Sequence, residues 1–211
     1  MGDIETDRWE VRAPMHIRFF DTFNLLGLAS FEYLDIAGSR VYGGGGQLGV
    51  PFKLYSNAEA ERTWVLTPNV GIEGRGGIDI ASGNIMLQVG LTSHYTMRAT
   101  ERLKLTIINQ VSTFESLTLK YDDIEFKPDI DQWIVKNEIA FDLQMNAWSV
   151  LSASLTDTRF LNEAAIDDYQ DLEIGLAATT GSFWTISTFA RHTFANGYDA
   201  TTAGAYVDFG F

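Results

Sequence analysis

The stretch Ala203-Gly-Ala-Tyr-Val-Asp-Phe-Gly-Phe211, at the carboxyl end of the chain, decides the fold class. Successive side chains of a β-strand point to opposite faces, so alternate residues of this stretch share a face. One face carries Ala203, Ala205, Val207, Phe209 and Phe211, and the other carries Gly204, Tyr206, Asp208 and Gly210. The sequence therefore predicts a final strand that has one apolar face and stops on an aromatic residue.

The same alternation recurs along most of the chain. Ile85, Leu87, Val89 and Leu91 alternate with Asn84, Gln88, Thr92, His94 and Arg98, and comparable segments begin near Trp9, Val41, Trp64, Leu103, Trp133 and Leu172. About eleven segments have the period of a strand, and no helix-period segment competes with them. The glycine run Gly43–Gly46 lacks the Lys-Ser/Thr and the helix of a phosphate-binding loop, so it is interpreted as part of a strand.

Composition limits the classes of protein that remain. The chain has 211 residues, no cysteine and a formal net charge of −13, and residues 9–211 are expected to form one domain after a tail at 1–8. That tail lacks the features of a signal peptide, which would have been removed from an exported protein. The acidic balance disfavours nucleic acid as a partner, and cysteine-based disulfides and metal sites are excluded. No apolar run is long enough for a membrane-spanning helix.

A soluble barrel buries its apolar face, whereas a membrane barrel turns that face outward. Three patterns favour the membrane barrel. The polar face carries charges of both signs in mid-strand, such as Glu138 and Arg98, and tryptophans stand at strand beginnings beside turns. Longer connections at 120–131, 162–168 and 196–202 also alternate with tight turns at 99–101, 145–147 and 180–182.

A closing strand that ends in Phe resembles the last strand of bacterial outer-membrane β-barrels. The resemblance implies an all-β, transmembrane, antiparallel up-and-down barrel in the outer membrane of a Gram-negative cell. It also implies that Phe209 and Phe211 act as a signal for the barrel-assembly machinery, and that both termini are periplasmic. The strand number should then be even, so a hidden strand near 116–130 would give twelve, which is preferred. A single strand from residues 9–37 would give ten.

This phasing assigns two sets of candidate residues. The lumen-lining set is Arg12, His16, Arg18, Lys53, Glu73, Arg75, His94, Arg98, Lys136, Glu138, Asp142, Glu173 and Asp208. The aromatic girdle, expected at the membrane surfaces, is Trp9, Trp64, Trp133, Trp148 and Trp184. Both signs of charge occur in the lumen set, which favours ion pairs across a narrow passage over a strongly selective pore.

About twelve strands without a plug are similar to the translocator β-domain of autotransporters, although the passenger and the long lumen helix are missing. The main hypothesis is a narrow or gated, translocator-like channel for small polar solutes, with outer-membrane lipid and lipopolysaccharide as surroundings and no cofactor. A sealed structural or adhesion barrel, acting through acidic extracellular loops, is the alternative. The acidic loop at 120–131 is expected to be solvated or to bind divalent cations that bridge it to lipopolysaccharide phosphates. No enzyme motif was found, and a membrane hydrolase using His16 or His94 is the least favoured hypothesis.

Overall fold

Fourteen strands make up the described part of the chain, and nearly all belong to one sheet. The computed structural model describes residues 6–19, 23–36, 39–77, 82–117, 119–121, 124–126, 131–162, 168–179, 184–196 and 198–209. The strands are β1 (Thr6–Phe19), β2 (Phe23–Ile36), β3 (Ser39–Gly49), β4 (Phe52–Asn57), β5 (Arg62–Gly77), β6 (Ser82–Arg98), β7 (Leu103–Ser116), β8 (Leu119–Tyr121), β9 (Ile124–Phe126), β10 (Asp131–Asn146), β11 (Ser149–Phe160), β12 (Tyr169–Thr179), β13 (Trp184–Ala195) and β14 (Tyr198–Phe209). Among these residues no helix is long and apolar enough to cross a membrane.

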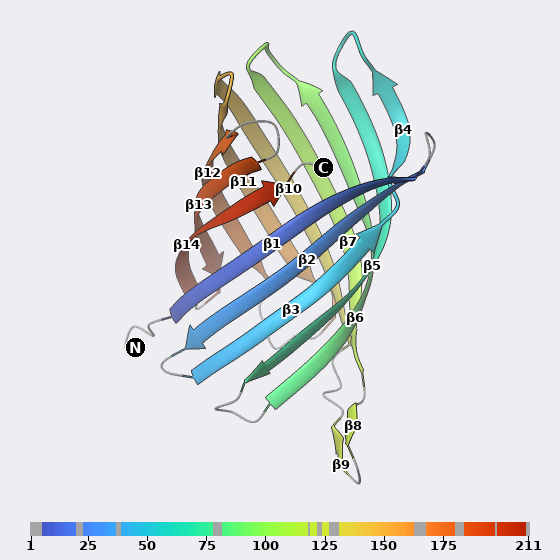
Figure 1. Ribbon diagram of the computed structural model, residues 1–211, viewed down its shortest axis with the longest axis vertical. Coiled ribbons are helices and arrows are strands. Elements are labelled where there is room, and N and C mark those ends of the chain that lie inside the picture. The colour runs from blue at the N-terminus through green and yellow to red at the C-terminus, as the bar shows by residue number, and fades with distance from the viewer. Residues whose placement is uncertain are drawn as a thin grey trace.

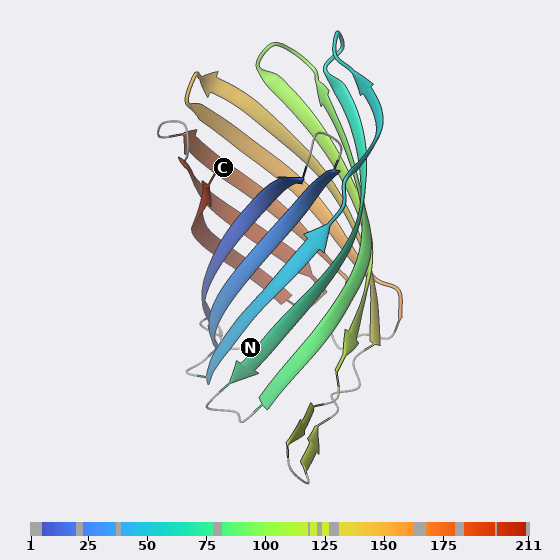
Figure 2. The ribbon, with the colours of Figure 1, turned by 45° about the vertical axis from the view of Figure 1, so that its right-hand side comes forward.

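Twelve of the strands form one curled antiparallel sheet in which each strand pairs with the next along the chain, except that β3 and β4 both pair with β5. The strands are steeply tilted and wrap around a common axis (Figures 1 and 2). Cα atoms of β1 and β14 come within 8 Å of each other, so the first and last strands lie side by side and the sheet curls into a barrel. The predicted all-β, up-and-down barrel of twelve strands is confirmed.

The twelfth strand is not where the sequence placed it. Residues 119–126 do form strands, but β8 and β9 pair only with each other, as a hairpin that projects from one end of the barrel (Figure 1). The count of twelve instead comes from a break in the long segment that begins near Val41. Val50 and Pro51 interrupt it, so that β3 pairs with the second half of β5 and β4 pairs with the first half. Proline cannot donate to a ladder, which explains the break.

The position of the chain ends differs from the expectation. Because β3 and β4 share one neighbour, the path from β1 to β14 has eleven positions, and every step along it is antiparallel. β1 and β14 consequently run in the same direction, and the start of β1 and the end of β14 lie at opposite ends of the barrel (Figure 1). Chain ends on the same side of the membrane need an even number of positions, and the described sheet has eleven.

The two longest connections lie at the same end, as expected from their spacing, although short connections join β2 to β3 and β13 to β14 at that end too. We call the end where β4–β5, β6–β7 and β10–β11 are joined the turn end, and the end that carries the connections 117–130 and 161–168 the loop end. The end of β14 belongs to the turn end. The long connection expected at 196–202 is shorter than predicted, because β14 already begins at Tyr198.

The distribution of side chains is that of a barrel turned inside out. Within the described residues there is no buried hydrophobic core, and buried side chains include Thr67, Asn69, Ser112, Thr156 and Thr158. Large apolar side chains such as Val89, Phe141 and Ile174 are about half exposed on the outer face. A soluble barrel would show the reverse pattern, because burial of apolar surface is what stabilises a protein in water.

Glycine permits close packing of the strongly bent strands. A Cβ on Gly45 would lie 2.8 Å from the carbonyl oxygen of Ile72 on the neighbouring strand β5. Only glycine fits at position 45 without moving backbone, and the run Gly43–Gly46 lies inside strand β3.

Candidate functional site: the polar lumen

The inner face of six neighbouring strands, β2, β3, β5, β6, β7 and β10, lines a half-open cavity of about 270 Å³. Its polar lining is Gln47, Thr67, Asn69, Thr92, His94, Gln110, Lys136 and Glu138, and its apolar lining includes Leu26, Leu28 and Ile108. Amide and hydroxyl groups predominate in this lining. Its one lysine, Lys136, and its one carboxylate, Glu138, lie two residues apart on β10. Such groups exchange hydrogen bonds readily with water and with uncharged polar solutes.

Hydrogen bonds join part of this lining into a fixed arrangement. Gln47 Nε2 donates to Asn69 Oδ1 at 2.7 Å, and Asn69 Nδ2 donates to Thr92 Oγ1 at 3.1 Å and to the carbonyl of Thr67 at 3.2 Å. Asn69 is therefore bonded on both its oxygen and its nitrogen. The lumen wall at this level is preorganised by three strands, and its side chains are held in place.

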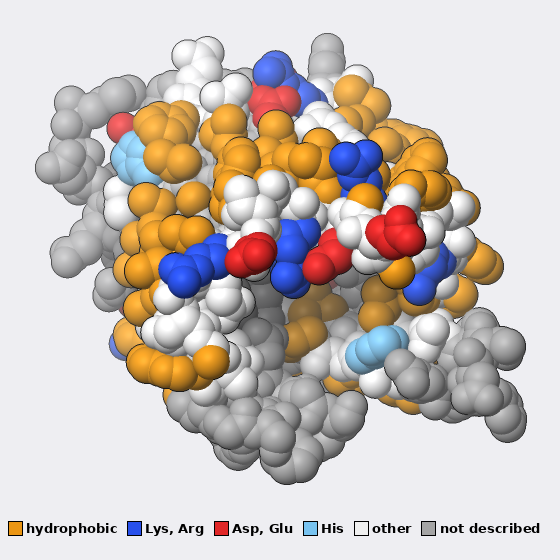
Figure 3. Space-filling view, turned by 90° about the horizontal axis from the view of Figure 1, so that it is seen from above, with side chains coloured by type: hydrophobic (Ala, Val, Ile, Leu, Met, Phe, Trp, Pro, Cys, Tyr) orange, Lys and Arg blue, Asp and Glu red, His pale blue; other side chains and the backbone are white. Residues whose placement is uncertain are grey.

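Charges on the inner face are paired at both ends and between them. Toward the loop end, Arg75 binds Glu73 at 2.6 Å and Glu32 at 3.1 Å. Toward the turn end, Lys104 lies 2.7 Å from Asp142 and Arg98 lies 2.5 Å from Glu61. Seen from the turn end, basic and acidic side chains alternate across the molecule beside a hollow (Figure 3).

A fifth pair lies on β12 and β13. Arg191 donates from Nε and Nη2 to the same Glu173 oxygen, at 2.8 and 2.6 Å, and its guanidinium lies 5.3 Å from the ring centroid of Phe189. The sequence phasing assigned Glu173 to the lumen but missed Arg191. On the same strand, β13, Thr188 and His192 place polar side chains on the outward face. The strand therefore lacks the clear alternation of apolar and polar residues that identified the other strands.

The structure places the remaining lumen candidates as follows. His94, Lys136 and Glu138 line the cavity, whereas Lys53 on β4 and His16 on β1 are exposed. The strands that carry Arg12, Arg18 and Asp208 are described, but their side chains lie outside the described part. Lining a conducting pore stays a prediction for the whole set.

Four of the girdle tryptophans are described, and all are exposed. Trp9 and Trp133 lie near the loop end, and Trp64 and Trp148 near the turn end, with exposed fractions from 42% to 72%. Trp64 Nε1 donates to Ser93 Oγ at 2.8 Å. Two levels of outward tryptophan fit two membrane surfaces, although contact with lipid stays a prediction. The side chains of Trp184 and Phe209, and all of Phe211, lie outside the described residues.

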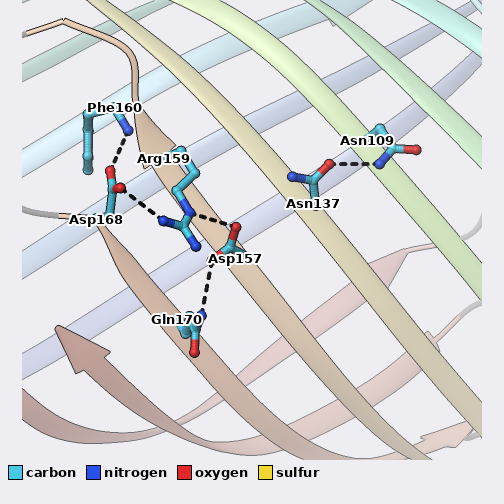
Figure 4. A network of polar contacts seen from close by, with 7 residues as sticks. All are labelled: Asn109, Asn137, Asp157, Arg159, Phe160, Asp168 and Gln170. Atoms are coloured by element: carbon cyan, nitrogen blue, oxygen red, sulfur yellow. Dashed lines mark hydrogen bonds and ion pairs between the residues drawn. The ribbon is translucent and has the colours of Figure 1, made fainter.

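A row of polar side chains crosses the outer face, and the sequence did not reveal it. Ser93, Asn109, Asn137, Asp157 and Gln170 stand directly opposite one another on five consecutive strands, β6, β7, β10, β11 and β12. We call this row the outer polar stripe. Figure 4 shows its centre, where Asn109 Nδ2 donates to Asn137 Oδ1 at 2.8 Å.

The stripe ends in a charged cluster near the loop end. Arg159 binds Asp157 at 2.9 Å and Asp168 at 3.3 Å, and Gln170 also donates to Asp157 (Figure 4). Each strand contributes only one or two residues to the stripe. Strand register alone brings them together, so a single segment gave no signal.

Two further arrangements bear on chemistry. On the outer face near the loop end, His192 Nε2 lies 2.7 Å from Asp199, and His192 Nδ1 lies 2.8 Å from Thr201 Oγ1. Among the described residues no group of three His, Cys, Asp or Glu could hold a metal ion. Of the acidic residues in the loop 120–131, which the sequence suggested as a site for divalent cations, Asp122, Asp123 and Asp129 lie outside the described residues.

Comparison with known proteins identifies the architecture. No family model matches this chain, and no curated protein matches it in sequence. The solved structure of the KdgM porin in complex with disordered oligogalacturonate matches with a TM-score of 0.56, at 12% identity, over 99% of this chain and 98% of that one. The KdgM porin matches with a TM-score of 0.51, also at 12% identity, over 98% and 99% of the two chains.

An autotransporter barrel is similar to the same degree. The β-domain of the Bordetella autotransporter BrkA matches with a TM-score of 0.52, at 9% identity, over 91% of this chain and 83% of that one. These likenesses, together with the outward apolar face, lead to one conclusion: the chain has the fold of outer-membrane β-barrels of the porin and autotransporter-translocator kind.

Proposed function

We propose that this protein is an integral outer-membrane channel, with residues 9–211 as its single domain, and that it passes small polar solutes through a narrow lumen. The observation that carries the proposal is the hydrogen-bonded wall of Gln47, Asn69 and Thr92 around the inner cavity. A barrel that served only as an anchor has no need of a preorganised polar cavity. The porin neighbours support a channel at the level of the fold.

The paired charges support a preference for uncharged solutes. Each of the described arginines Arg75, Arg98 and Arg191 is bound by a carboxylate, so none of the three is a strong attractor for anions. A lumen with neutralised charges discriminates weakly between ions. Uncharged, hydroxyl-rich solutes fit the amide lining best, and a narrow passage would limit their size.

The orientation and surroundings follow from the two ends. We place the turn end in the periplasm and the loop end at the cell surface, because outer-membrane barrels have short periplasmic turns and longer extracellular loops. Outer-membrane lipid and lipopolysaccharide would contact the girdle tryptophans. The barrel-assembly machinery would read the strand that ends at Phe209 and Phe211.

The test is conductance of the refolded protein in planar bilayers, combined with swelling of liposomes in solutions of neutral sugars. Discrete conductance steps and sugar entry are expected. Asn69→Leu should lower both several-fold, since it removes the central hydrogen bonds of the wall. Val70→Leu, the next residue on the same strand but on the outer face, is the matched control and should change neither. A folded barrel without conductance would overturn the channel and leave the sealed adhesion barrel.

A hydrolase is a second candidate, because carboxylate, imidazole and hydroxyl stand in the order of a catalytic triad at Asp199, His192 and Thr201. The group faces outward, where a lipid ester could reach it. Hydrolysis of a short-chain ester that is lost in both His192→Ala and Thr201→Val would support it. Equal background rates in the wild type and in Thr201→Val would exclude it.

A further inference from the structure

The middle of the outer polar stripe lies where lipid is expected. Asn109 is at the centre of β7 and Asn137 is near the centre of β10, and both side chains are exposed. Apolar outward residues flank them on both sides, Ile107 and Ile139 toward the turn end and Val111 and Val135 toward the loop end. Hydrocarbon offers no hydrogen bonds, so polar side chains at this depth are costly unless another protein group binds them.

Each asparagine side chain satisfies only part of the hydrogen-bonding capacity of the other. Asn109 Nδ2 donates to Asn137 Oδ1 at 2.8 Å. Within the described part of the chain, the other two groups of this pair, Asn109 Oδ1 and Asn137 Nδ2, have no hydrogen-bond partner. One free acceptor and one free donor therefore stand side by side on the outer face.

We propose that this face of β7 and β10 is the contact surface for a second copy of the same chain in the membrane. A twofold axis between the copies would bring Asn137 Nδ2 of each onto Asn109 Oδ1 of the other. Two hydrogen bonds would then join the copies. The four flanking aliphatic side chains would pack around this centre. The inference rests on the membrane placement of the proposed function.

The geometry of the stripe supports a second copy over an unrelated partner. Copies that are inserted in the same direction are related by an axis along the membrane normal. The stripe runs across tilted strands, so two facing stripes cross at one point and do not overlie each other along their length. The Asn109–Asn137 pair at the crossing then meets the same pair of the other copy, so the pair as a whole must be self-complementary. Asparagine, with a donor and an acceptor, meets that requirement, whereas the acidic Asp157 end of the stripe does not.

The chain contains no cysteine, so a single introduced thiol reports contact between copies. Val111→Cys places the thiol beside Asn109, and Val11→Cys places it on β1, across the barrel from β7 and β10; both positions are outward and exposed. Oxidation in phospholipid liposomes at low protein density should cross-link the Val111→Cys protein and leave the Val11→Cys protein monomeric.

The asparagines are then replaced in the same background. Asn109→Leu combined with Asn137→Leu keeps a lipid-compatible surface, and it should weaken association about tenfold, measured as the lipid dilution that halves cross-linking. Equal cross-linking at both cysteine positions, or no effect of the leucines, would overturn the proposal. Conductance is recorded in the same liposomes. Conducting barrels that do not cross-link refute the dimer alone, and cross-linked barrels that do not conduct refute the channel alone.

Discussion

The pair Arg191–Glu173 offers the sharpest test of a lumen stabilised by paired charge. Arg191→Met removes two hydrogen bonds of 2.8 and 2.6 Å to one Glu173 oxygen while keeping an apolar stem against Phe189. The Arg191 and Glu173 side chains are 21% and 25% exposed, so the carboxylate that remains is largely desolvated. Exposed pairs contribute below about 1 kcal/mol, and removing one partner of a buried pair costs about 3–5 kcal/mol. At this intermediate exposure we expect a loss of about 2 kcal/mol.

The Arg98–Glu61 pair is the matched control in the same molecule. Its side chains are 50% and 49% exposed, so Arg98→Met should cost less than about 1 kcal/mol. Free energies of unfolding are measured by urea titration in detergent micelles with tryptophan fluorescence. Glu173→Gln added to Arg191→Met should recover about half of the loss, because it removes the unpaired charge. Equal costs for the two arginines, or no recovery, would refute the reasoning.

Three further changes test other parts of the structure. Gly45→Ala should destabilise the barrel by about 1–3 kcal/mol in the same urea titration, because its Cβ would meet the Ile72 carbonyl at 2.8 Å, whereas outward Gly46→Ala should be neutral. Lys136→Gln should shift reversal potentials toward cation permeation and Glu138→Gln toward anions. The cation-to-anion permeability ratio should change about threefold in each case, because one charge at about 6 Å in water contributes about 0.7 kcal/mol. Quenching by brominated lipid should be weaker in Trp133→Leu than in the wild type, and an unchanged signal would remove this residue from the girdle.

Local alternation predicted the fold and the orientation of most strands. The register places Ile85, Leu87 and Val89 outward and His94 inward, as their sequence spacing indicated. A period of two residues is a local property, and a strand that has lipid on one side and water on the other preserves it over its whole length.

Features that depend on relations between strands could not be predicted in this way. The break at Pro51 raises the strand count to twelve without adding a position around the barrel, so the path keeps eleven positions and the chain ends lie at opposite ends. The Arg191–Glu173 pair and the Asn109–Asn137 pair both join neighbouring strands through register, which no single segment encodes. The site was therefore predicted as a set of inward charges, while their pairing and the outer polar stripe came from the structure.

The shared direction of β1 and β14 determines where the barrel should open first. All the other neighbouring strands of the described sheet are antiparallel, whereas any pairing at this seam has the slanted geometry of parallel strands, which is less stable per residue. Heating or pulling should part the wall along this line before any hairpin separates. Amide hydrogen exchange should accordingly begin in β1 and β14 and reach β6 and β7 last.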